Sequence, residues 1–162
     1  MYAFGYGLTY GKVSYKNAAV APVEAKAECG PDPSNCGHVT VCVEVTNDKD
    51  AAHATEEVVQ VYAAPAATIK GASLPKQVLL GFTRTAKLQP GDSETVCVPV
   101  DLADLRLMGE GEKSFTLLRG HYTISVGGSS PGPQGTYVQH GGDTDTSGLG
   151  GAAALELQLE LV

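Results

Sequence analysis

Residues 38–47 carry the pattern that most constrains what this chain can fold into. The segment reads HVTVCVEVTN, and valine occupies every second position from Val39 to Val45. Successive side chains of a β-strand point to opposite faces, so this alternation predicts a half-buried strand with its valines in a core. A helix would need apolar residues three and four positions apart, which this segment does not have.

Six further segments are predicted as strands because they carry β-branched or apolar residues between turn signals. Strong turn signals lie at Asn47–Asp50 and Gln89–Asp92. We expect one helical turn at Asp101–Leu107 and a hairpin that joins two of the strands through Arg119 and Gly120. The segments are 56–63, 78–85, 93–101, 114–118, 121–126 and 154–162. About seven antiparallel strands with almost no helix predict an all-β sandwich of the fibronectin type III or immunoglobulin-like kind.

The charge of the chain excludes two classes of partner. Its 162 residues carry a formal net charge of −7, and only 18% of them are charged. Nucleic acids and anionic membrane surfaces both select basic patches, so we expect neither as a partner. No apolar run reaches the roughly 18 residues that span a bilayer. Residues 1–11 lack the basic and apolar regions of a signal peptide.

The sequence predicts no catalytic residues. Its 18 acidic residues are scattered over predicted turns and outward strand faces. Glu56 and Glu57 are adjacent, and neighbouring residues of a strand point to opposite faces. The histidines have no shared spacing, and no Gly-x-Ser-x-Gly nucleophile motif occurs. They are His38, His53, His121 and His140.

No metal or cofactor is expected either. Residues 143–148 read DTDTSG, which fits the first half of a calcium-binding loop. The twelfth position of such a loop is a bidentate glutamate, and in this chain it is Ala154. We therefore interpret the segment as part of a Gly-rich and Ser-rich loop.

Seven blocks of the sequence, in order, resemble the fibronectin type III-like C-terminal domain of family 3 glycoside hydrolases. The first, YAFGYGLTY at 2–10, resembles the Pro-Phe-Gly-x-Gly-Leu-Ser-Tyr segment through which that domain is reached from the preceding α/β domain. The second and third are strands, VEVTN at 43–47 and EVVQVY at 57–62. The others are LLGF at 79–82, LQPG at 88–91, DLADL at 101–105 and GHYTISVG at 120–127.

This resemblance implies a function for the chain and two parts within it. Residues 1–12 would be an interdomain segment, and residues 13–162 the sandwich, with a flexible insertion at 128–151. The chain would be a non-catalytic accessory domain that braces the catalytic domains of a β-glucosidase or β-xylosidase in the same polypeptide. The catalytic carboxylates of that family lie in upstream domains, so the enzyme would be the longer protein. The alternative is a stand-alone extracellular module that binds an unknown extracellular protein.

The aromatic cluster at the N-terminus is the candidate contact surface. The predicted contact residues are Tyr2, Phe4, Tyr6, Leu8 and Tyr10. We expect them to pack against a neighbouring domain, and the alternative is that they line the rim of a substrate cleft. Without a neighbour they would form an exposed apolar patch.

Four cysteines, an even number in a small β-rich chain, indicate an oxidising and hence extracellular location. Cys42 and Cys97 both point away from the valines of their strands, which are antiparallel neighbours in a sandwich of this family. We expect them to form a disulfide. Cys29 and Cys36 flank a turn-rich loop and are predicted to pair with each other. The alternative is four free thiols in a reducing compartment.

Overall fold

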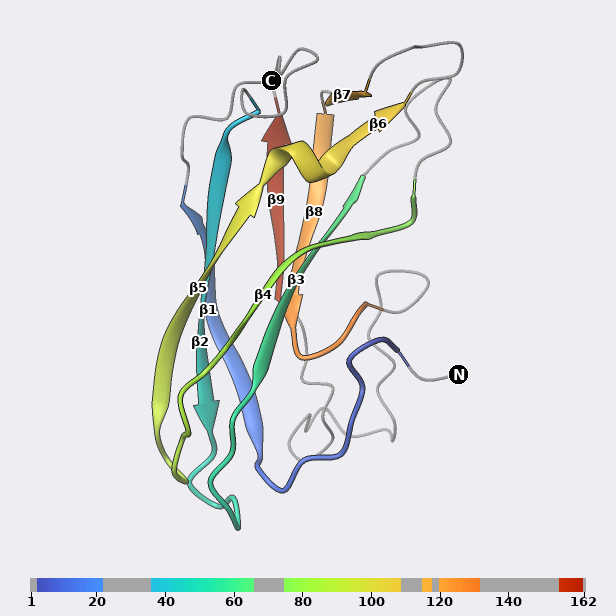
Figure 1. Cartoon of the computed structure of the whole chain (residues 1–162). Helices are drawn as coiled ribbons and strands as arrows, with labels where there is room; N and C mark the ends of the chain where they lie inside the picture. Colours follow the sequence, from blue (N-terminus) through green and yellow to red (C-terminus); the bar gives the residue numbers. More distant parts are fainter. Residues whose placement is uncertain are drawn as a thin grey trace.

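The predicted all-β sandwich is confirmed by a computed structural model (Figure 1), which describes residues 3–21, 36–65, 75–108, 115–117, 120–131 and 155–161. Two antiparallel sheets face each other, and a short two-stranded ladder lies at one end. The first sheet has the order β1 (Val13–Ala21), β2 (His38–Asn47), β5 (Ser93–Asp101). The second has the order β4 (Val78–Arg84), β3 (Val58–Pro65), β8 (Gly120–Gly127), β9 (Leu155–Leu161). The ladder pairs β6 (Arg106–Met108) with β7 (Phe115–Leu117).

The core lies between the two sheets and is built largely from valine. The alternating valines of β2 are buried, as predicted, and the residues between them are partly exposed. Strand β5 alternates in the same way and pairs with β2 along its length. Pro99 faces outward on β5, which is the last strand in the order of its sheet, so its missing N–H interrupts no inner ladder. The predicted helical turn is present as the 3₁₀ helix η2 (Leu102–Leu105), capped by Asp101, but it is shorter than predicted because Arg106 and Leu107 belong to β6.

Strand β3 is buried on both of its faces. Val59 and Val61 face the core, and Gln60 and Tyr62 on the opposite face are also buried. A sandwich strand normally leaves its outward side chains in water, so something must cover this face. The segment that precedes β1 supplies part of that cover, because Gly5 packs against the Gln60 side chain.

The hairpin prediction was wrong, and two strands of the described residues, β1 and β6, were not predicted. The segment 114–118 does not form a hairpin with 121–126, because β7 pairs with β6 while β8 lies between β3 and β9. Strand β1 was not predicted at all. Its alternation breaks where the pairing with β2 shifts between Lys16 and Ala19, and Asn17 there has φ 52°. A bulge of this kind disrupts the period-two pattern on which the prediction relied.

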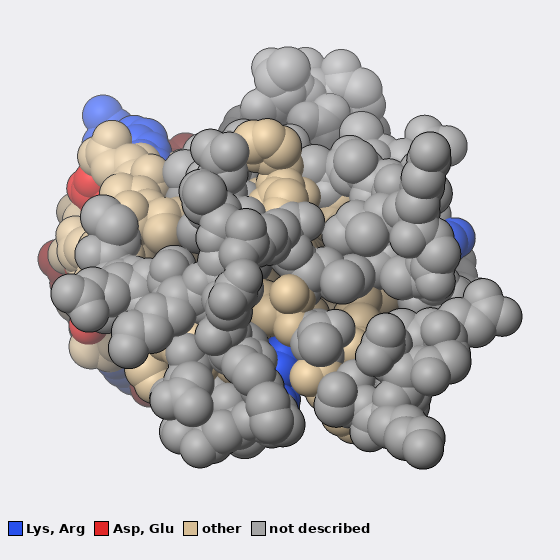
Figure 2. All heavy atoms as spheres, turned by 90° about the horizontal axis from the view of Figure 1, so that it is seen from above, with Lys and Arg blue, Asp and Glu red and all other residues tan. Residues whose placement is uncertain are grey.

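The basic side chains of the described residues are dispersed in the view from above. Lys and Arg appear at separate places and form no broad basic patch among the atoms coloured there (Figure 2). Within the described ranges, no helix has the length and apolar character needed to cross a bilayer.

Several residues singled out in the sequence lie outside the described residues. They are Tyr2, Cys29, His140, the calcium-like string 143–148 and residues 132–151 of the predicted flexible insertion. The first four residues of that insertion, 128–131, are described, and all four are buried.

Candidate functional site

Residues 3–12, called the N-terminal segment, run along one end of the sandwich (Figure 1). The segment is hydrogen-bonded to the sandwich at several points. Near the start of the segment, the Phe4 N–H donates to Ser130 Oγ (3.1 Å), and the Ser130 N–H donates to the Phe4 carbonyl (2.8 Å). In its middle, the hydroxyls of Thr9 and Thr55 lie 3.1 Å apart. These contacts attach the segment to the chain that follows β8 and to the loop that precedes β3.

Asn47 anchors the other end of the N-terminal segment. Its side chain is fully buried, and its Oδ1 accepts from the Lys12 N–H at 3.0 Å. Its Nδ2 donates to the carbonyls of His53 (3.0 Å) and Leu88 (3.1 Å). One amide therefore joins three loops at this end, and each of these buried polar groups finds a partner.

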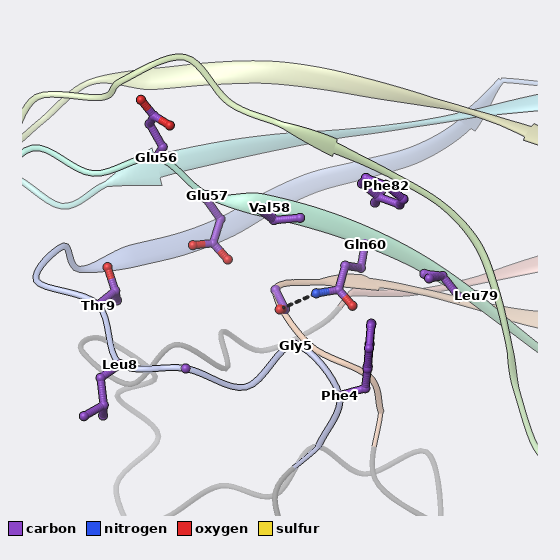
Figure 3. Close-up of a pocket in the computed structure, with 12 residues that line it drawn as sticks. Phe4, Gly5, Leu8, Thr9, Glu56, Glu57, Val58, Gln60, Leu79 and Phe82 are labelled. Carbon is purple, nitrogen blue, oxygen red and sulfur yellow. Dashed lines mark hydrogen bonds between the residues drawn. The ribbon is translucent and has the colours of Figure 1, made fainter.

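Gly5 brings the backbone of the N-terminal segment against a side chain of β3. Gln60 on β3 donates from Nε2 to the Gly128 carbonyl at 2.8 Å, the dashed line in Figure 3, and its Oε1 accepts from the Tyr62 hydroxyl at 2.5 Å. A Cβ at Gly5 would collide with Gln60 Nε2, and Gly5 has φ 81°. Both the space and the backbone conformation therefore require glycine at this position.

A groove of about 470 Å³ opens between the N-terminal segment and strands β3 and β4 (Figure 3). Its apolar side chains are exposed to an unusual degree: Phe4 is 70% exposed, Leu8 86% and Phe82 68%. Leu79 and Val58 continue this apolar lining. The remaining lining residues are Gly5, Gly7, Thr9, Glu56, Glu57, Gln60 and Gly128. Clustered exposed apolar side chains of this size are typical of interaction surfaces rather than of a solvated exterior.

Glu57 is a partly buried acidic residue of the groove lining. It precedes β3, and its carboxylate points toward the N-terminal segment (Figure 3). Burial raises the pKa of Glu57, while a hydrogen bond from the Tyr15 hydroxyl (2.8 Å) acts in the opposite direction and is the smaller effect. A Cβ on Gly128 would collide with Glu57 Oε1, so the backbone of residue 128 packs directly against this carboxylate.

The predicted contact residues take different positions. Phe4 and Leu8 lie at the groove, and Tyr10 is 85% exposed with its ring edge-on to His53 at a centroid distance of 5.8 Å. Tyr6 is half-buried. Sequence reasoning missed Phe82, Leu79 and Glu57, which come from other elements. No sequence signal marked Phe82, because period-two alternation places it on the inward face of Leu80, and only the register shift between β3 and β4 changes this.

Glu56 and His38 form surface ion-pair contacts that do not involve Glu57. Glu56 points away from Glu57 (Figure 3) and pairs with Arg84 at 3.2 Å. His38 Nδ1 lies 3.9 Å from Asp101 Oδ1. Among the residues that the structure describes, no three His, Cys, Asp or Glu side chains come together as metal ligands.

The predicted disulfide between Cys42 and Cys97 is present. The two residues are directly opposite in the β2–β5 ladder, with Cα atoms 4.0 Å apart, on the outward face of the sheet. Cys36 is buried and also disulfide-bonded. Its predicted partner, Cys29, is outside the described residues, so that pairing stays a prediction.

Comparison with known proteins places this fold in a class. Residues 57–130 match the family model described as the fibronectin type III-like domain. An exo-α-(1→6)-L-arabinopyranosidase of Bifidobacterium longum is 36% identical over 129 residues, 80% of this chain and 15% of that protein. The crystal structure of a β-D-glucoside glucohydrolase from Trichoderma reesei has a TM-score of 0.69 and 26% identity, covering 98% of this chain and 20% of the other. A GH3 β-glucosidase of Bifidobacterium adolescentis has a TM-score of 0.62 and 26% identity, covering 98% and 18%.

The fold is therefore that of a fibronectin type III-like β-sandwich domain. The chain belongs to the fibronectin type III-like domains of family 3 glycoside hydrolases. It spans 15% to 20% of the length of the three proteins just described, and in each of them the matching region is a small part of a much longer chain.

Proposed function

We propose that this domain is a non-catalytic accessory domain of a longer family 3 glycoside hydrolase, a β-glucosidase or β-xylosidase, and that it docks on the catalytic part through the groove and the N-terminal segment. The relatives support this arrangement because each carries the matching region within a longer glycosidase. Residues 1–12 would then be the connection to the preceding domain, and 13–162 the sandwich.

The observation that carries the proposal is the exposed apolar groove beside a well-anchored segment. Phe4, Leu8 and Phe82 are each more than two-thirds exposed, although the backbone around Phe4 and Lys12 is held by hydrogen bonds. A rigid apolar surface buries area on docking without a large loss of conformational freedom. The N-terminal segment is hydrogen-bonded to loops of the sandwich. It would therefore hold the preceding domain in a fixed position relative to the sandwich rather than act as a free hinge.

The disulfide supports an extracellular location for the polypeptide. The Cys42–Cys97 bond lies on the outward face of the sheet, with Cys97 exposed. Exposed structural disulfides persist in oxidising compartments and are rare in the cytosol. We therefore place the parent protein outside the cytosol.

The docking test uses the full polypeptide that carries this domain, with Phe82→Ser compared with Phe115→Ser. Phe115 is 50% exposed on β7, outside the groove lining, and is the matched control. Burying a phenylalanine contributes about 1.5–3 kcal/mol. We expect Phe82→Ser to lower the melting temperature and speed proteolysis at the domain junction, and Phe115→Ser to do neither. Equal behaviour of the two variants would contradict docking through the groove.

The non-catalytic role has its own test. The 162-residue chain is expected to release no aryl group from aryl β-glucosides or aryl β-xylosides. Turnover that survives repurification, and that is the same in independent preparations, would show a catalytic site in this domain and overturn that part of the proposal.

A further inference from the structure

The side chains that line the groove indicate which chemical group it binds. Its walls come from two sources: Phe4 and Leu8 on the N-terminal segment, and Leu79 and Phe82 on β4 (Figure 3). Two of these four are phenyl rings with most of their area in solvent. Phenyl faces attract cations as well as apolar carbon.

The charged groups that line the groove have one sign. They are the carboxylates of Glu56 and Glu57, and the described lining contains no Lys, Arg or His. The Glu56 carboxylate is already paired with Arg84 and points away from the space (Figure 3). Glu57 accepts a hydrogen bond from a neutral tyrosine hydroxyl through Oε1, and its carboxylate is directed toward the N-terminal segment.

Burial costs the Glu57 carboxylate part of its hydration, and a neutral donor restores only a fraction of it. A positive group in the occupant would compensate this cost, and the interaction would be stronger than at an exposed site because water is partly excluded. The groove is thus complementary to a side chain that combines an apolar or planar stem with a cationic end.

Arginine fits this description better than lysine. Its guanidinium is planar, stacks on aromatic rings and donates to carboxylates in a fixed fork, and it is less strongly hydrated than an ammonium group. A lysine ammonium is a compact, strongly hydrated charge that loses more when it enters an apolar groove. The two phenyl rings and the carboxylate provide the contacts that a guanidinium uses.

We propose that the groove receives an arginine side chain, presented by the catalytic part of the same polypeptide, with its guanidinium bound to Glu57 and its stem against Phe4 and Phe82. This inference rests on the proposed function for the source of the arginine. It assigns Glu57 a binding role that is separate from the apolar contacts tested by Phe82→Ser.

The test uses the 162-residue chain and two small probes, Nα-acetyl-arginine amide and Nα-acetyl-citrulline amide. Citrulline has the shape of arginine without its charge, so the pair isolates the charge. Binding is followed by the ¹³C shift of the Glu57 carboxyl, assigned with Glu57→Gln, and by the ring signals of Phe82. We expect the arginine probe to bind about tenfold more tightly than the citrulline probe, as for a charge-assisted hydrogen bond.

The variants separate the parts of this inference. Glu57→Gln keeps an acceptor for Tyr15 and should remove the preference for arginine, whereas Glu56→Gln should leave it unchanged. Phe82→Ala should weaken both probes and preserve their ratio. Equal binding of the two probes to the unaltered chain, absence of binding, or an arginine preference that survives in Glu57→Gln would overturn the inference. None of these results bears on docking itself, which the comparison of Phe82→Ser with Phe115→Ser decides.

Discussion

At the scale of single residues, the N-terminal segment depends on a few positions where no other side chain fits. Gly5 is one of them, because it has φ 81° and lies against the Gln60 amide and the Gly128 carbonyl. Gly7, two residues further on, has open space where a Cβ would lie, with no atom beyond its chain neighbours within 4 Å, and no left-handed backbone. The two glycines therefore form a natural comparison.

Gly5→Ala is expected to lower the free energy of unfolding by about 2 kcal/mol or more, because the left-handed conformation alone costs an alanine about 1 kcal/mol and the contact with Gln60 adds to it. Gly7→Ala should change it by less than about 0.5 kcal/mol. Urea unfolding followed by circular dichroism measures both. If the two variants were equally stable, the close packing of the segment on β3 would be wrong.

Glu57 makes the stability of the domain depend on pH. Burial raises its pKa above the ordinary value of 4.5, and the Tyr15 hydrogen bond offsets this only in part. A group with a raised pKa in the folded state contributes stability that is present below the unfolded pKa and is lost as pH rises through the folded pKa. When the groove is empty, the ionised carboxylate of Glu57 therefore lowers the free energy of unfolding as the pH rises toward neutral.

Glu57→Gln removes this titration and keeps the side chain neutral. We expect its free energy of unfolding, relative to that of the unaltered chain, to rise between about pH 4 and about pH 7. Urea unfolding at the two pH values measures the change, with Glu56→Gln as the control because that carboxylate is exposed and paired with Arg84. A relative loss of stability of Glu57→Gln over the same interval would mean that burial does not raise the pKa of this carboxyl.

At the scale of elements, the sequence predicted a strand correctly where its apolar and polar residues alternate without a break. The valines of β2 and β5 alternate without interruption, so both strands and their inward faces were predicted, and the outward phase of Cys42 and Cys97 led to their pairing. Strand β1 was missed because the bulge near Asn17 breaks the alternation. The predicted partner of β7 was wrong, because whether β7 pairs with β6 or with β8 depends on the whole sheet rather than on the sequence of β7.

The groove was predicted only in part, for a similar reason. Phe4 and Leu8 stand out in the sequence as part of an aromatic cluster, but Phe82 lies far along the chain on another element. No local pattern indicates that these side chains share a surface. The burial of Gln60 and Tyr62 on the outward face of β3 was not predicted either, because it depends on what packs over that strand.

The disulfide between β2 and β5 gives an element-scale prediction. Its cysteines are 55 residues apart, and the chain-entropy model assigns such a loop closure about 4 kcal/mol of stabilisation. Replacing both residues, Cys42→Ser with Cys97→Ser, should therefore lower the free energy of unfolding by about that amount. Urea unfolding of the purified variants is the measurement.

The control comes from the same two strands. Thr46 and Ser93 are opposite each other on the same outward face, with hydroxyls 2.7 Å apart and no covalent link. Replacing both by alanine should cost less than about 1 kcal/mol, as for other cross-strand pairs. A loss for the cysteine variant no larger than for this control would show that the cross-link contributes little to the fold.

At the scale of the whole molecule, two features have to be reconciled: a sandwich with a well-packed valine core, and an apolar groove left open at its N-terminal segment. A stand-alone module would expose Phe4, Leu8 and Phe82 to water until a separate partner covered them. As one domain of a longer chain it would bury them. The second arrangement matches the relatives, in which the corresponding region is a fifth of the protein or less.

The mass of the native polypeptide that carries the domain distinguishes these two arrangements, measured in its source by immunoblot and by mass spectrometry of the purified protein. We predict a species several times larger than the 16.7 kDa of this chain, with peptides from a glycoside hydrolase on its N-terminal side. A native species of 16.7 kDa, with no such peptides, would contradict the accessory role and would mean that the groove serves a separate partner.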